Sequence, residues 1–235
     1  MIPVLLALSP AFAGERIFAF SYGYGTVPKG GIEVENYNTA SIAESGDVSW
    51  THQGELEYGI TDRLEGGLYL VSESAGSGPI TFSAWKARLK YRFGAEGVGA
   101  VDPAIYFEYI GSPNLDEHAL EAKFILGKDV KRLRTALNVE YKFEFGGEDL
   151  VHEISPSLGL GFKVAKPLIL GLEAVGELEF VGDEVEGPRV WAGPTAHLAG
   201  EGGKLWWTLA ALAPVGGDAA TDKGWVVRSL VAVNL

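Results

Sequence analysis

Two groups of residues in this chain have types and spacings that could do chemistry: paired glutamates and four histidines. Glu55 and Glu57 lie two positions apart, so on a strand their carboxyl groups would share one face and could act as general acid and base. Both also belong to a longer run in which every second residue is charged or polar. Solvation in an aqueous interior therefore explains the pair better than acid–base catalysis does.

The histidines favour neither nucleophilic catalysis nor metal binding. Nucleophilic catalysis needs a hydroxyl within hydrogen-bond reach of an imidazole. His152 shares its strand face with Ile154 and Pro156, whereas Ser155 belongs to the opposite face. No two of the four histidines lie at metal-ligand spacing, and the other three are His52, His118 and His197. We therefore predict rim or interface histidines, no enzymatic activity, no metal site and no cofactor.

A two-residue alternation of apolar and polar residues must position all of these side chains. In residues 48–60, Trp50, Leu56 and Tyr58 share one face, while Glu55 and Glu57 share the other. This is the period of an extended strand. A soluble lipocalin-like carrier would have to enclose many apolar rings in a small lumen. The pattern instead favours rings that face lipid and carboxylates that face inward, as in a transmembrane β-barrel.

The alternation and the turn residues together predict a closed antiparallel transmembrane β-barrel of twelve strands, with about ten to fourteen strands compatible with the pattern. Most connections alternate between short turns and longer polar loops, such as 181–187, which places both termini on the periplasmic side. The connection 94–102 departs from this rule because it is long where a short turn is expected. The predicted strands are 31–40, 48–60, 62–72, 80–93, 103–111, 117–127, 132–144, 151–163, 167–180, 188–199, 204–214 and 224–235.

The chain divides into three predicted parts. Residues 1–13 resemble a secretory signal peptide without its basic start, since an apolar run precedes the small-residue site Ala11-Phe12-Ala13. Residues 14–29 alternate aromatic side chains and form either a periplasmic leader or a plug in the lumen. Residues 30–235 form one barrel domain. A signal peptide followed by a barrel predicts the outer membrane of a Gram-negative bacterium.

Charged residues of the inward face predict the lining of the lumen. Carboxylates dominate the first three strands, and a ladder of basic residues follows on the fourth. Against lipid, Lys or Arg would cost about 2–4 kcal/mol each at the membrane midplane, so the charged face must point inward. The predicted lumen and selectivity residues are Glu33, Glu35, Glu55, Glu57, Glu65, Lys86, Arg88, Lys90, Arg92, Glu108, Glu121, Lys123, Glu140, Lys142, Glu173, Glu177 and Arg228.

Aromatic residues on the outward face collect near the two ends of the predicted strands. Outer-membrane barrels carry such girdles where the membrane meets water. The predicted membrane-interface aromatics are Trp50, Tyr58, Tyr91, Phe93, Tyr109, Tyr141, Phe143, Phe162, Phe180, Trp207 and Trp225.

Composition excludes several partners. The formal net charge of -12 argues against nucleic acid, because no basic stripe is available to displace counterions from phosphates. The chain contains no cysteine, which suits an oxidising envelope. The glycines of 157–162 (SLGLGF) alternate with leucines, which indicates close strand packing or a bend and not a nucleotide cradle.

Two segments resemble outer-membrane porin-like and phenol-degradation-type barrel proteins. They are YGITDRLEGGLYL at 58–70 and YGYGTVPKGGIEVE at 22–35. The resemblance implies a barrel fold and no catalytic motif. The end LVAVNL resembles the closing strand that the barrel-insertion machinery recognises, although Leu235 stands where an aromatic residue is usual.

The expected function is a narrow passive channel for small polar solutes or ions, with a charged lumen. The expected partners are outer-membrane lipid, the barrel-insertion machinery and small polar solutes, with no nucleic acid. Two alternatives stay open: a filled barrel with a structural or accessory role, and a carrier of small hydrophobic compounds.

Overall fold

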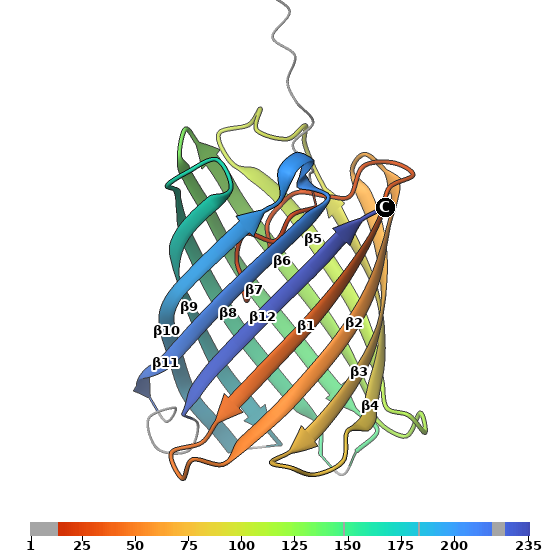
Figure 1. The fold of residues 1–235 in the computed structure, drawn as a ribbon. Helices are drawn as coiled ribbons and strands as arrows, with labels where there is room; N and C mark the ends of the chain where they lie inside the picture. The colour runs from red at the N-terminus through yellow and green to blue at the C-terminus, as the bar shows by residue number, and fades with distance from the viewer. Residues whose placement is uncertain (1–13, 148, 183, 218–223) are drawn as a thin grey trace, which may run out of the picture.

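The computed structural model describes residues 14–147, 149–182, 184–217 and 224–235, which form a closed antiparallel barrel (Figure 1). Each strand pairs with its neighbours in sequence, and the first strand closes the barrel against the last. The predicted fold class and the count of twelve strands are confirmed. The strands are β1 (Ile32–Ile42), β2 (Val48–Thr61), β3 (Leu64–Ala75), β4 (Thr81–Arg92), β5 (Asp102–Gly111), β6 (His118–Val130), β7 (Leu133–Phe145), β8 (Val151–Lys163), β9 (Leu168–Val181), β10 (Glu184–Ala199), β11 (Leu205–Gly217) and β12 (Trp225–Asn234).

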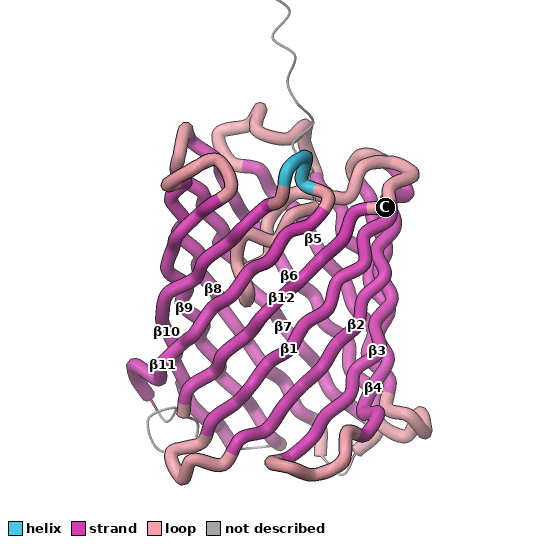
Figure 2. Tube along the Cα trace, in the orientation of Figure 1, coloured by secondary structure: helices cyan, strands magenta, loops and turns pink. Residues whose placement is uncertain are grey.

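Strand dominates the wall, and a short 3-10 helix, η1 (Glu201–Gly203), lies between β10 and β11 (Figure 2). Within the described ranges, no helix is both long enough and apolar enough to span a membrane. The predicted signal peptide, residues 1–13, lies outside the described residues.

The alternation in β2 shows why this sequence forms a barrel wall. Leu56 and Tyr58 are each 50% exposed on the outer surface, whereas Glu55 and Glu57 are 2% and 3% exposed inside. Successive side chains of a strand point to opposite faces, so a closed sheet sorts them into an apolar exterior and a charged interior. The same sorting applies to Leu68 on β3, which is 61% exposed.

This orientation predicts the effect of a charge on the outer wall. Replacing Leu68 with arginine should destabilise the barrel by about 2–4 kcal/mol, because the guanidinium would face hydrocarbon. Urea unfolding of protein refolded into lipid vesicles measures the change. Val98, which is exposed in the connection between β4 and β5, is the matched control. A Leu68→Arg variant as stable as Val98→Arg would show that this face does not meet lipid.

The two termini of the barrel domain lie at one end, which we call the terminal mouth, because β1 begins there and β12 ends there (Figure 1). The long connection between β4 and β5 also lies at this end. It is held by Lys128 on β6, whose ammonium donates to the carbonyl oxygens of Gly97, at 2.9 Å, and of Gly99. Lys128 also pairs with Asp102 at 3.3 Å. The connection between β4 and β5 is thus anchored to β6, although it is longer than the short turn expected at this end of the barrel.

The predicted loop 181–187 is wrong, because β10 begins at Glu184 and not at Pro188. Glu184 pairs with Val181 and Glu186 pairs with Glu179, so the pairing of β9 with β10 extends into the predicted loop. The register then shifts between Glu186 and Arg189, which accommodates Pro188 as an irregularity. Proline lacks the N–H that a ladder needs, so it marks a bulge here and not the start of the strand.

Residues 14–29 do not join the wall. They enter the barrel from the terminal mouth and return to it before β1 begins (Figure 1). Phe18, Ala19, Tyr24 and Val27 are buried there, each at most 6% exposed. We call residues 14–29 the internal segment.

Candidate functional site

The charged interior is the candidate site, and it collects side chains from almost every strand. The predicted lumen residues are either buried or half-buried. The half-buried ones are Lys86, Glu140, Lys142, Glu177 and Arg228. The buried ones are Glu33, Glu35, Glu55, Glu57, Glu65, Arg88, Lys90, Arg92, Glu108, Glu121, Lys123 and Glu173.

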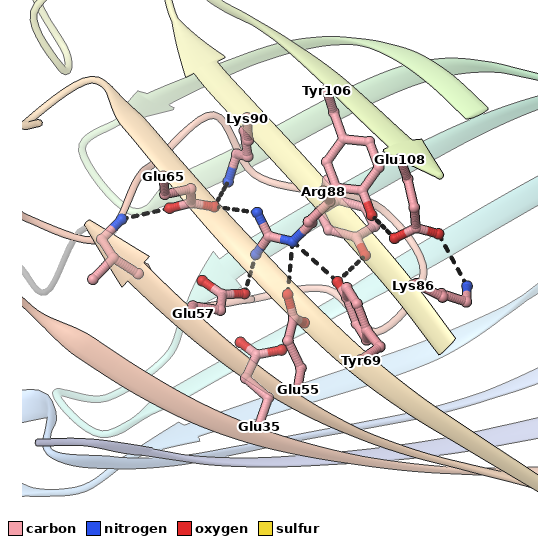
Figure 3. A network of polar contacts seen from close by, with 12 residues as sticks. Glu35, Glu55, Glu57, Glu65, Tyr69, Lys86, Arg88, Lys90, Tyr106 and Glu108 are labelled. Carbon is pink, nitrogen blue, oxygen red and sulfur yellow. Dashed lines mark hydrogen bonds and ion pairs between the residues drawn. The ribbon is translucent and has the colours of Figure 1, made fainter. Parts of the chain in front are cut away.

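Arg88 on β4 is the centre of the largest ion-pair network (Figure 3). Its guanidinium contacts Glu55 at 2.6 Å and Glu65 at 2.8 Å, and it also pairs with Glu57. Every side chain in this set is at most 4% exposed. Arginine suits this position because its fork offers several donors in fixed directions. One cation thereby bridges carboxylates from β2 and β3.

A second network lies beside the first. Lys86 pairs with Glu108 at 3.1 Å, and the Tyr106 hydroxyl donates to the same carboxylate (Figure 3). Further round the wall, Lys123 bridges Glu121 at 3.1 Å and Glu140 at 2.8 Å. Lysines of the inner wall therefore neutralise carboxylates on their own and on neighbouring strands.

Glu173 on β9 binds the backbone of the internal segment. Its two carboxylate oxygens accept the N–H groups of Ala19, Phe20 and Ser21 at 2.7, 2.8 and 3.0 Å. The carboxylate is 1% exposed. Three convergent backbone donors satisfy a buried carboxylate without a cation. The segment is thus held by a side chain of the wall and not by strand pairing.

Other wall residues bind the same segment along its length. Asn138 accepts the N–H of Tyr22 at 2.6 Å and donates to the Tyr22 carbonyl at 3.0 Å. Glu65 accepts the N–H of Val27 at 2.6 Å. Arg228 lies over the Phe20 ring, 4.2 Å from its centroid. Because these contacts come from side chains of the wall, withdrawing the segment would not unpair any strand.

Glycines of the wall make room for the aromatic residues of the segment. A Cβ at Gly159 would lie 2.6 Å from the Phe18 ring, and a Cβ at Gly127 would lie 2.4 Å from the Tyr24 ring. Neither position tolerates a side chain while the ring is docked. The glycines of 157–162 therefore serve close packing, and the partner is a ring of the internal segment.

Aromatic residues also face inward, in addition to the charged residues predicted to line the lumen. Their signal was present, since they share the alternating face with predicted lumen charges. Tyr37 follows Glu35 by two positions, and Tyr106 precedes Glu108 by two. The buried inward rings are Tyr37, Tyr69, Tyr106, Trp191 and Trp206.

The prediction of rim or interface histidines is wrong for His197, which is 1% exposed inside the barrel. Its Nδ1 lies 2.8 Å from Oγ1 of Thr208, and its Nε2 lies 3.5 Å from Glu15. The Thr208 hydroxyl donates its hydrogen to the Arg16 carbonyl at 2.5 Å. The imidazole must then donate to Thr208, which is the wrong direction for a base that activates a hydroxyl.

The other three histidines lie on the outer surface beside aromatic rings. His52 stacks on Trp50 with 6.1 Å between ring centroids. His118 and His152 lie within hydrogen-bond distance of tyrosine hydroxyls, 2.6 Å from Tyr109 and 2.7 Å from Tyr141. The predicted interface aromatics Trp50, Tyr58, Tyr91, Phe93, Tyr141, Phe162, Trp207 and Trp225 are exposed, and Tyr109, Phe143 and Phe180 are half-buried.

A cavity of about 590 Å³ opens at the terminal mouth. The internal segment lines it through Glu15 and Phe18, and the wall contributes Lys163 and His197. Glu96, from the connection between β4 and β5, lies at the same cavity, and partial burial raises the pKa of its carboxyl above the ordinary value. Residues of the internal segment and of the wall therefore line this cavity together.

No protein-family model and no curated protein sequence matches the chain. Solved structures do match. The COG4313 outer membrane channel from Pseudomonas putida F1 aligns over 90% of this chain and 98% of its own, with a TM-score of 0.63 and 13% identity. The NanC porin aligns over 87% of this chain and 100% of its own, with a TM-score of 0.56 and 10% identity. The chain therefore has the fold of outer-membrane β-barrels, among them a channel and a porin.

The prediction that the chain is no enzyme needs correction. LpxR from Salmonella typhimurium also matches, over 86% of this chain and 99% of its own, with a TM-score of 0.49 and 8% identity. A barrel architecture does not by itself exclude catalysis, because a fold does not determine a function.

Proposed function

We propose that this protein is a narrow passive channel for small polar solutes or ions in a bacterial outer membrane, and that the internal segment closes it in the described conformation. The observation that carries the proposal is the attachment of the segment through Glu173 and Asn138. A barrel that needed permanent filling could do so with side chains of the wall. Here a separate stretch of chain fills the lumen through contacts that break without unpairing any strand.

The charged lining supports polar cargo. Water or small ions can replace protein groups around Glu173 and Lys123 once the segment leaves, whereas an apolar solute would leave these charges unsolvated. Both signs of charge line the interior, which favours small polar or zwitterionic solutes over large ions of one sign.

The proposed surroundings follow from the same barrel. The outer wall meets outer-membrane lipid, and the closing strand is the segment that we expect the barrel-insertion machinery to bind. Membership in the phenol-degradation-type group stays a prediction from 58–70 and 22–35, as does a Gram-negative source with a cleaved signal peptide.

Planar-bilayer recording tests the proposal. We expect the full chain to show little or rare conductance, and a variant that lacks residues 14–29 to show stable conductance at least tenfold higher. The matched control is Val98→Ser in an exposed connection, which should behave as the full chain does. Silence of the deletion variant, when heat-modifiable gel migration shows that it has folded, would favour the filled structural barrel.

A further inference from the structure

Three buried glutamates meet on the inner wall where β1 and β2 pair. Glu33 lies directly opposite Glu57, and Glu35 lies directly opposite Glu55. One carboxylate oxygen from each of Glu33, Glu35 and Glu57 lies within 4.8 Å of the other two. These three residues are 0%, 1% and 3% exposed. Like charges directly across a strand pair are destabilising, so something must compensate them.

Glu33, Glu35 and Glu57 each have a hydrogen-bond or ion-pair partner on one carboxylate oxygen, and Glu33 and Glu35 each have a second oxygen without one. Trp206 donates its indole N–H to Oε2 of Glu33 at 3.0 Å, and the Tyr37 hydroxyl lies within hydrogen-bond distance of Oε2 of both Glu35 and Glu55. Arg88 pairs with Glu57. In contrast, Oε1 of Glu33 and Oε1 of Glu35 are fully buried and have no hydrogen-bond partner in the protein. A buried unpaired carboxylate oxygen is costly unless a cation or a donor reaches it.

The nearby cationic side chains already pair with other groups of the protein. Arg88 serves Glu55, Glu57 and Glu65, and Lys90 pairs with Glu65 at 3.5 Å. Arg16 donates to the Tyr37 hydroxyl at 2.9 Å and to the Ala19 carbonyl at 3.3 Å. In the described part of the chain, neither Glu33 nor Glu35 has a salt bridge. If all five glutamates are ionised, the three cations leave two negative charges without a partner.

We propose that Glu33, Glu35 and Glu57 bind one divalent hard cation of the Ca²⁺ class. The ligands are all oxygen, which hard cations prefer, and the uncompensated charge matches a divalent ion. The indole N–H of Trp206 and the hydroxyl of Tyr37 hold Oε2 of Glu33 and of Glu35, as second-shell groups hold ligands at metal sites. The expectation of no metal site rested on histidine spacing, and it did not consider carboxylates that strand pairing brings together.

The internal segment covers this site. A Cβ at Gly14 would lie 3.2 Å from Oε1 of Glu33. A bound cation would therefore be enclosed beneath the start of the segment and would brace β1 against β2. The inference does not depend on conduction, since it concerns the wall alone.

Calcium binding to the full-length protein in detergent, after removal of metals with EDTA, tests the proposal. Titration calorimetry with CaCl₂ should show one saturable site, and Tb³⁺ should give luminescence on excitation of tryptophan, because Trp206 contacts a ligand. Glu33→Gln and Glu35→Gln should each weaken the affinity at least tenfold. Glu73→Gln, at an exposed glutamate on β3, should bind as the wild type does.

Thermal unfolding separates binding from a merely structural role. Calcium should raise the unfolding midpoint of the wild type, because a ligand that binds only the folded state stabilises it. Glu35→Gln removes a repulsion, so its metal-free midpoint should equal or exceed that of the wild type, and the calcium-dependent rise should be lost. The proposal would be overturned if no saturable site were found, or if both Gln variants kept the calcium-dependent rise of the unfolding midpoint. Protons or an amino group would then be the charge that compensates these carboxylates.

Discussion

Replacing Arg88 with methionine is expected to destabilise the barrel by about 3–5 kcal/mol, the range found when one partner of a buried ion pair is removed. Methionine keeps much of the arginine side-chain volume, so the loss reports the charge. Without the guanidinium, Glu55, Glu57 and Glu65 would remain buried with no donor in place of Arg88. Urea unfolding in lipid vesicles measures the difference from the wild type.

Two companions make this prediction specific. Arg63→Met, at an exposed arginine in the turn between β2 and β3, should change stability by less than about 0.5 kcal/mol. Adding Glu55→Gln and Glu57→Gln to Arg88→Met should recover part of the loss, because the orphaned charges disappear. A loss that these glutamine substitutions do not reduce would show that Arg88 acts through packing and not through its charge.

Replacing Glu173 with alanine is expected to release the internal segment from the lumen. Hydrogen bonds to a charged group contribute about 1.5–3 kcal/mol each, and this carboxylate accepts from the N–H groups of Ala19, Phe20 and Ser21. Losing this set should raise the undocked population of the segment at least tenfold. Limited proteolysis followed by mass spectrometry detects the release as faster cleavage within 14–29, and bilayer recording should show more frequent openings.

Glu179→Ala is the matched control for this prediction. Glu179 lies on the same strand and bonds to Arg189, not to the segment. Glu173→Gln should give an intermediate result, since the amide keeps one acceptor oxygen but loses the charge. Equal cleavage rates in the wild type and Glu173→Ala would show that the aromatic packing at Gly159 and Gly127 holds the segment without the carboxylate.

These variants act on different parts of the molecule. Arg88 stabilises the wall, because its partners lie on β2 and β3. Glu173 holds a removable segment, because its partners lie outside the wall. Loss of stability in the first variant and gain of conductance in the second would separate the scaffold of the barrel from its closure.

The sequence by itself determined the wall. Alternation in β2, visible at Glu55, Leu56, Glu57 and Tyr58, predicts which face of each strand is charged, and turn residues divide the chain into twelve strands. These signals are local, since a two-residue period and a turn each depend on a few consecutive residues. Where proline interrupted the pattern, at Pro188, the predicted strand began too late, since β10 starts at Glu184.

Only the tertiary structure decided how the interior is organised. Glu173 and Ala19 lie 154 positions apart, and nothing in either segment predicts that one binds the other. The burial of His197 and the meeting of Glu33 with Glu57 likewise depend on register and on what fills the lumen. Alternation predicts which side of the wall a residue faces. Which partner it meets inside depends on distances across the closed barrel, and every strand contributes to those distances.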